Sequence, residues 1–234
     1  MSVAELAALI RAHQPCVVLT GAGISTESGI PDFRSPGGLW AQFDPLDYGS
    51  IEAFRADPAR VWSFYSRHFE ALSTAEPNAG HRALAELERR GLVQAVITQN
   101  IDRLHERAGS REVVEVHGSI RTSSCPACGR RYPLEEVLDL LPVPACGDDG
   151  AVLKPDIVFF GELLPADAIE RAYALVHEAE LVIVVGSTLE VHAVAELPLE
   201  APRFAVVNVG PTSLDGRAAL RVEGRAGEVL PALL

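Results

Sequence analysis

Cysteine is scarce in this chain, with only Cys16, Cys125, Cys128 and Cys146 among 234 residues. So few cysteines exclude the disulfide framework on which small secreted domains depend. Cys125 and Cys128, in the run Cys-Pro-Ala-Cys, have instead the spacing of a metal-binding knuckle. Cys16 lies in an apolar run, and we interpret it as a small buried hydrophobic residue.

Long apolar runs and a targeting segment are also missing. No run approaches the length that a bilayer-spanning helix needs, and residues 1–12 lack the basic and apolar regions of a secretory signal. We therefore expect a cytoplasmic protein.

Basic charge is in deficit, because 20 Lys and Arg residues face 32 Asp and Glu residues, which gives a net charge of −12. This balance argues against binding to nucleic acid or to an anionic membrane, and it favours basic peptides as partners. Low-complexity tracts and internal repeats are absent from the sequence as well. The length suits one compact α/β domain with a small appended module.

Short β-branched runs alternate with helical patterns along most of the chain. Ser2 and Glu5 form a capping-box pattern before an amphipathic helix that ends near His13. Buried strands are predicted over 16–20, 95–98, 181–185 and 204–208, and further helices over 79–90 and 166–178. This alternation predicts a mostly parallel sheet with helices on both faces.

Two stretches interrupt the alternation: residues 31–76, with Pro and Gly breakers, and residues 121–154, with three of the cysteines. We interpret them as a smaller lobe made of a helical insertion and a Cys-containing, zinc-ribbon-like insertion. The large lobe would then be assembled from residues 1–30, 77–120 and 155–234. The cleft between the lobes is the expected active site.

Small and polar residues follow the predicted strands, where ligands bind in parallel sheets. They are Gly21-Ala22-Gly23, Gln99-Asn100, His117-Gly118, Gly186-Ser187-Thr188 and Asn208. Turns between strands and helices use Gly, Ser, Asn and Thr in any case. That explanation does not account for His117 or for the run Gln99 to Asp102.

The glycine loop after the first strand resembles the start of a dinucleotide fingerprint. The third glycine of G-x-G-x-x-G is missing, because position 26 is Thr. No second strand that ends in an acidic residue follows about 20 residues later to hold a ribose. A dehydrogenase that transfers hydride is therefore disfavoured.

The loop continues as Ile24-Ser25 and then as Gly29-Ile-Pro-Asp-Phe-Arg34, a pattern similar to the signature of the sirtuin family. The resemblance extends, in the family's order, to Thr-Gln-Asn-Ile-Asp at 98–102, Val-His-Gly at 116–118, Cys-Pro-Ala-Cys at 125–128, Lys-Pro-Asp-Ile-Val-Phe-Phe-Gly-Glu at 154–162 and Gly-Ser-Thr-Leu at 186–189. These motifs cover nearly the whole chain. The chain is thus identified as a member of that family, which implies a Rossmann-like sheet.

This resemblance implies an enzyme that removes acyl groups, acetyl above all, from the lysines of proteins or peptides. NAD would be consumed as co-substrate, and nicotinamide and O-acyl-ADP-ribose would be released. His117 matches the family's general base, a role that suits an imidazole with an ordinary pKa of about 6.5. Asn100 and Asp102 match the catalytic residues that organise the nicotinamide ribose and the amide pocket. Phe33 matches a residue that shields the reactive ribose.

The same resemblance supplies two sets of contact residues. The expected NAD contacts are Gly21, Ala22, Gly23, Asp32, Phe33, Arg34, Gln99, Asn100, Ile101, Asp102, Gly186, Ser187, Thr188, Asn208 and Ala226. The expected substrate contacts are Tyr65, His68, Val158, Phe159, Phe160, Gly161 and Glu162. The peptide would bind as an added extended strand.

The acyl group is expected to be neutral. Family members that prefer succinyl or malonyl groups carry Tyr-x-x-Arg, whose Arg pairs with the acyl carboxylate. This chain keeps Tyr65 but has His68 at the Arg position, and Arg67 comes one residue early on a helix that turns about 100° per residue. We therefore predict that acetyl is preferred over succinyl.

The metal site departs from a four-cysteine pattern. Cys125, Cys128 and Cys146 align with zinc ligands of the family, whereas Val143 occupies the third ligand position. Either three thiolates hold zinc with a fourth ligand recruited from Asp148 or Asp149, or the cluster is metal-free. Loss of one ligand favours weak or substoichiometric zinc over a full site.

Two other functions stay open from the sequence. The activated ribose could be captured by a protein nucleophile, which would make the chain a mono-ADP-ribosyltransferase. Alternatively, the chain could be a catalytically silent regulator that senses NAD. The presence of His117, Asn100 and Asp102 weighs against the silent regulator.

Overall fold

A six-stranded parallel sheet forms the centre of the computed structural model, which describes residues 2–33, 35, 37–41 and 43–234. The strands lie in the order β3-β2-β1-β7-β8-β9. Their bounds are β1 Cys16–Thr20, β2 Ala95–Thr98, β3 Val113–Glu115, β7 Leu181–Val185, β8 Phe204–Asn208 and β9 Leu220–Glu223. Strands β1, β2, β7 and β8 are buried throughout, which explains their unbroken apolar runs. The predicted α/β fold with a parallel sheet is confirmed.

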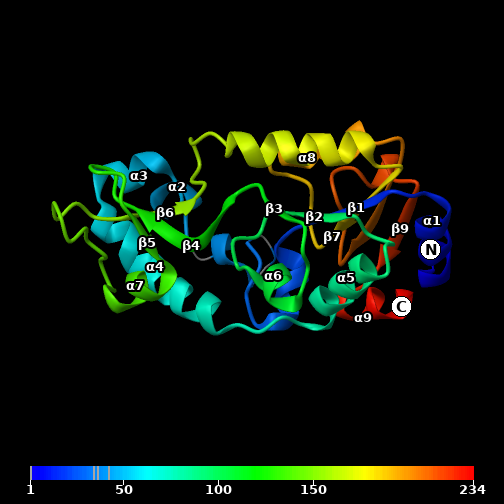
Figure 1. The fold of residues 1–234 in the computed structure, drawn as a ribbon, viewed down its shortest axis with the longest axis horizontal. Coiled ribbons are helices and arrows are strands. Elements are labelled where there is room, and N and C mark those ends of the chain that lie inside the picture. The colour runs from blue at the N-terminus through cyan, green and yellow to red at the C-terminus, as the bar shows by residue number, and fades with distance from the viewer. Residues whose placement is uncertain (1, 34, 36, 42) are drawn as a thin grey trace.

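Helices cover both faces of this sheet (Figure 1). One face packs against α1 (Val3–Ala12), α5 (Ala79–Arg89) and α9 (Ala226–Val229), and the other packs against α8 (Ala166–Glu178) and the 3-10 helix η3 (Val194–Glu200). Successive residues of β1 alternate between the two cores, as the pleat of a strand requires. The capping box predicted at the start of α1 is present.

A smaller antiparallel sheet lies at the other end of the molecule (Figure 1), with strand order β5-β4-β6. Its strands are β4 Gly118–Ser124, β5 Arg131–Pro133 and β6 Lys154–Ile157. Around it lie α2 Pro45–Tyr48, α3 Ile51–Ala56, α4 Pro58–Thr74 and α7 Leu134–Asp139. A third apolar core, which includes Trp62, Phe69 and Val137, holds these elements together. The predicted limits of the small lobe, 31–76 and 121–154, stay a prediction.

The remaining elements are short. They are α6 Leu104–Ala108 and the 3-10 helices η1 Ala22–Ser28, η2 Leu39–Ala41, η4 Asp215–Arg217 and η5 Pro231–Leu233. Among the described residues, no helix is long and apolar enough to cross a membrane.

Candidate active site

The loops that follow β1 and β7 meet at the point where the strand order reverses, which is where parallel sheets open a ligand crevice. Gly23 N donates to Gly186 O at 2.8 Å, and a Cβ built on Gly21 or Gly23 would lie 2.8 Å from that oxygen. Gly186 itself has φ +63°. Only glycine allows this approach, so a side chain at these positions would push the two loops apart. The loop continues into η1 rather than into the α-helix of a dehydrogenase fingerprint.

A large cavity of about 1090 Å³ opens above this glycine contact. Its lining includes the predicted general base His117 and most of the residues predicted to touch NAD: Gly21, Ala22, Gly23, Asp32, Phe33, Gln99, Asn100, Gly186, Ser187, Thr188, Asn208 and Ala226. These residues come from separate loops at one edge of the sheet, and the volume accommodates a dinucleotide. Arg34 lies outside the described residues.

A second cavity of about 490 Å³ has a largely apolar wall and contains every predicted substrate residue: Tyr65, His68, Val158, Phe159, Phe160, Gly161 and Glu162. Ile101 and Asp102 line this cavity and not the first. Gln99, Asn100 and His117 line both cavities. Ala22, Phe33, Trp40 and Val191 also line both, so the two cavities meet around these seven residues.

His117 is half-buried at this junction, directly before β4. Its Nδ1 lies 3.0 Å from Gln99 O, and because a carbonyl oxygen can only accept, Nδ1 carries the proton and Nε2 carries the lone pair. Burial lowers the pKa of His117 from the ordinary imidazole value of 6.5, although the hydrogen bond to Gln99 acts in the opposite direction. The side chain is therefore neutral at neutral pH and can accept a proton at Nε2.

Asn100 and Asp102 are both buried and share one partner, Ser25 of η1. Ser25 Oγ donates to Asp102 Oδ2 at 2.6 Å and accepts from Asn100 Nδ2 at 3.1 Å. Leu104 N donates to the other carboxylate oxygen, Oδ1, at 2.9 Å. Burial raises the pKa of Asp102, while the hydrogen bonds from Ser25 and Leu104 lower it. Both side chains are thus held rigidly at the floor of the junction.

Two buried histidines beneath this floor were not predicted from the sequence. His81 Nε2 lies 3.4 Å from Ser25 Oγ, and His105 Nε2 lies 2.9 Å from Thr20 Oγ1. Burial lowers the pKa of His81 to about 4 and that of His105 well below 6.5, so both rings are neutral. Asn78, which caps α5 three residues before His81, was the available sequence signal.

An aromatic stack lies where the two cavities meet, because Phe33 and Trp40 line both of them. Trp40 lies 5.5 Å from Phe33 and 6.1 Å from Phe64, measured between ring centroids, and both pairs are nearly parallel. Tyr65 and His68 stand on the same helix, α4, and both pack against Phe64. His68 Nδ1 lies 2.7 Å from Phe64 O, so this nitrogen carries the proton. Trp40 was also not predicted from the sequence.

The segment 158–162 lies between His117 and α3. Val158 N donates to His117 O at 2.9 Å, and Phe160 N donates to Gly49 O at 2.8 Å. The Phe160 carbonyl in turn accepts from Ile51 N at 3.0 Å. The backbone next to the predicted general base is therefore fixed from both sides.

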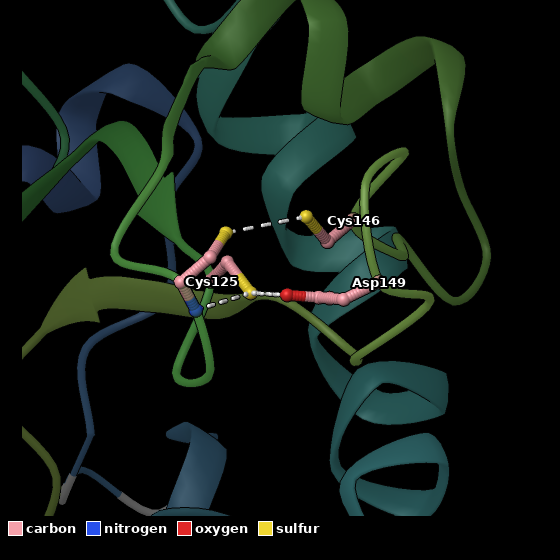
Figure 2. Close-up of side chains that lie close together, drawn as sticks. Cys125, Cys146 and Asp149 are labelled. Atoms are coloured by element: carbon pink, nitrogen blue, oxygen red, sulfur yellow. Dashed lines mark hydrogen bonds between the residues drawn. The ribbon is translucent and has the colours of Figure 1, made fainter.

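The cysteine cluster lies in the smaller lobe, in the turns beside β4 and β5. Figure 2 shows Cys125, Cys146 and Asp149 directed toward one another. One ligand atom from each of Cys125, Cys128, Cys146 and Asp149 lies within 4.8 Å of all the others. Asp148, the other candidate, is turned away into an exposed ion pair with Arg130 at 3.1 Å.

The spacing within this cluster fits a tetrahedral metal. Two thiolates bound to one zinc ion lie about 3.8 Å apart, as Zn–S bonds of about 2.3 Å and tetrahedral angles require. Cys128 Sγ and Cys146 Sγ lie 3.7 Å apart, and Cys125 Sγ lies 3.3 and 3.4 Å from the carboxylate oxygens of Asp149. The donor set of three thiolates and one carboxylate is one that zinc accepts.

The fold and the two joined cavities are those of an α/β protein with a site large enough for a dinucleotide beside a largely apolar cavity. The Sir2 family model matches residues 21–193. NAD-dependent protein deacylase 2 of Pyrobaculum aerophilum is 47% identical over 100% of this chain and 94% of its own length, and NAD-dependent protein deacylase 1 of Archaeoglobus fulgidus is 42% identical over 93% and 91%. A Sir2 structure with deacetylated p53 peptide and 3′-O-acetyl ADP ribose has a TM-score of 0.94 and 41% identity, and covers 98% of this chain and 96% of its own. The chain belongs to the Sir2 family.

Proposed function

We propose that this protein is an NAD-dependent protein deacylase. The observation that carries the proposal is the junction of the two cavities at His117, Asn100 and Gln99. A dinucleotide in the large cavity and an acyl-lysine in the apolar cavity would place their reacting atoms at this point. The relatives named above support the same activity.

NAD supplies an activated ribose carbon that the acyl oxygen can attack while nicotinamide leaves. His117 Nε2 takes a proton from a ribose hydroxyl, since Gln99 fixes the opposite nitrogen as the donor. Phe33 and Trp40 close the space beside the ribose and exclude water from it. His117 therefore acts as the general base.

Asn100 and Asp102 hold the nicotinamide end. Asn100 Nδ2 spans from Gly21 O at 3.2 Å to Ser25 Oγ at 3.1 Å, so the amide is oriented before the co-substrate binds. Asp102 Oδ2 accepts a hydrogen bond from the Ser25 hydroxyl. Preorganised polar groups of this kind stabilise charge that develops during the reaction without further rearrangement.

The acylated substrate would be a peptide that pairs with the segment 158–162 and extends its lysine toward His117. The acyl end would lie near Tyr65 and His68, where no arginine among the described residues lines the cavity and the surrounding rings favour a neutral acyl group. Burial strongly raises the pKa of Tyr65, so its hydroxyl is un-ionised. Acetylated protein lysines are therefore the proposed substrates.

We also propose that zinc, when bound, is held by Cys125, Cys128, Cys146 and Asp149, and braces the small lobe. The four donors lie outside both cavities, so this metal supplies folding energy rather than chemistry. Weak or substoichiometric zinc and a cytoplasmic location stay predictions.

The role of His117 is tested by His117→Ala. A general base contributes about 10² to 10⁴ in rate, so turnover should fall by that factor while ADP-ribose still binds. His177→Ala is the matched control, because His177 lies on the exposed surface of α8 and pairs only weakly with Glu200 at 3.4 Å. Near-normal turnover of His117→Ala would overturn the assignment.

A further inference from the structure

Lys154 is the only lysine in the sequence, and all three N–H donors of its ammonium group have partners within the protein. Nζ lies 3.0 Å from Pro155 O, 2.9 Å from Ile157 O and 2.9 Å from Glu162 Oε2. It also lies 4.6 Å from the centre of the Phe159 ring. An ammonium has three N–H donors, and here each finds an oxygen acceptor.

Glu162 closes the other end of the same loop. Its Oε2 accepts both the Lys154 ammonium and, at 2.8 Å, the backbone N–H of Phe159. The side chains of Lys154 and Glu162 are only 20% and 24% exposed. A charge-assisted pair with this burial and this many hydrogen bonds is held more firmly than an exposed surface pair.

The loop that this pair closes is the segment proposed to bind the peptide. Val158 within it is bonded to His117 O, and Phe160 is bonded on both sides to the residues around Ser50. A shift of the loop would therefore move the edge against which a peptide strand pairs. The sequence predicts Glu162 as a substrate contact. Its Oε2 is already bonded to Lys154 and to the Phe159 N–H within the protein.

We propose that Lys154 and Glu162 form a clamp that positions the peptide-binding segment, and that Glu162 acts through Lys154 rather than by contact with the substrate. This inference rests on the proposed function for its kinetic consequence. The pair between Lys154 and Glu162 can also be detected in the free protein, without an activity assay.

The kinetic test compares Lys154→Met, Glu162→Gln and Lys154→Arg. Methionine keeps most of the length of the lysine side chain but removes the charge, whereas arginine keeps the charge and hydrogen-bond donors. We expect the KM for an acetylated peptide to rise about tenfold in Lys154→Met and Glu162→Gln with kcat changed much less, because ground-state positioning is lost. Lys154→Arg should recover most of the loss, and the affinity for ADP-ribose should be unchanged in all three.

The matched control is Arg171→Met, which breaks the exposed 2.8 Å pair between Arg171 and Glu112, neither of which lines either of the two cavities. Its KM should equal that of the wild type. If the wild type is active and Lys154→Met has an unchanged KM, the clamp is refuted. If the wild type deacylates no peptide, the proposed function fails and the clamp is decided by the next experiment alone.

The second experiment exploits the single lysine. Protein labelled with ¹⁵N at lysine Nζ gives one ammonium signal, which belongs to Lys154. We expect this signal to persist at neutral pH through slow hydrogen exchange, and to shift or broaden in Glu162→Gln. This result holds even if Lys154→Met does not fold. A signal exchanging as fast as that of free lysine, and identical in Glu162→Gln, would overturn the proposal.

Discussion

The hydroxyl of Thr98 links the buried His105, through Thr20, to Asn100 in the candidate active site, and Thr98→Val removes that hydroxyl with almost no change of shape. Thr98 Oγ1 accepts from Thr20 Oγ1 at 2.8 Å and from Asn100 N at 3.0 Å, and both donors are buried. In the variant, the Thr20 hydroxyl can turn to His105 Nε2, which lies 2.9 Å away. The Asn100 N–H then has no acceptor.

One buried donor without a partner costs about 1 to 3 kcal/mol of unfolding free energy. Denaturation in urea should show this loss as a lower midpoint with an unchanged slope. Because the N–H without an acceptor belongs to Asn100, the exchange of free labelled nicotinamide into NAD should also slow. Thr98→Ser keeps the acceptor and removes one methyl group, which costs about 0.8 kcal/mol and should leave exchange nearly normal.

A double variant separates the polar chain from simple packing. If Thr20 and Thr98 act as one network, Thr20→Val combined with Thr98→Val should cost less than the sum of the two single variants. A structural role for the Thr98 hydroxyl would be refuted if Thr98→Val were as stable and as active as the wild type. It would also be refuted if Thr98→Ser lost as much exchange activity as Thr98→Val.

Three further predictions follow from the site. Burial favours the neutral form of His117, so its pKa lies below the ordinary imidazole value of 6.5. We therefore expect kcat/KM, measured between about pH 5 and 8, to stay flat as the pH drops through 6.5 and to decline only below it. An inflection at or above pH 6.5 would contradict this. In protein purified without chelator, the zinc content should fall in Asp149→Ala but not in Asp148→Ala, and it should rise in Val143→Cys. Equal zinc content in all three variants would rule out Asp149 as a ligand. Because His68 stands at the position where an arginine would pair with an acyl carboxylate, acetyl-lysine peptides should react faster than succinyl-lysine peptides. The reverse order in a panel would show that the acyl pocket is misassigned.

The core strands of the large sheet were predictable because they are buried throughout. Strands β1, β2, β7 and β8 have the predicted bounds, since a fully buried strand leaves a continuous apolar run in the sequence. The outer strands β3 and β9 were not predicted. They have three and four residues and only partial burial, so their patterns are too short to stand out.

The candidate site divides in the same way. Residues that follow a strand, such as His117 and Asn100, could be placed by their position alone, because all parallel strands end at one edge. The histidines His81 and His105 could not, since they stand on different helices and meet only through packing, with ring centroids 4.9 Å apart. Local spacing carries no record of such a contact.

The fourth metal donor shows a further limit. Asp148 and Asp149 are neighbours in sequence, and nothing in their order says which one faces the cysteines. The turn from Cys146 to Gly150, whose N–H bonds back to Cys146 O at 2.9 Å, directs Asp149 inward. The choice between the two carboxylates is therefore made by backbone geometry.

Product analysis tests the central proposal most directly. The protein should be incubated with NAD and an acetyl-lysine peptide, and the products should be identified by mass spectrometry over time. We expect deacetylated peptide, nicotinamide and O-acetyl-ADP-ribose to appear in equal amounts in the wild type, and all three to nearly vanish in His117→Ala. Deacetylated peptide formed without NAD, or ADP-ribose attached to the peptide with its acetyl group intact, would contradict it.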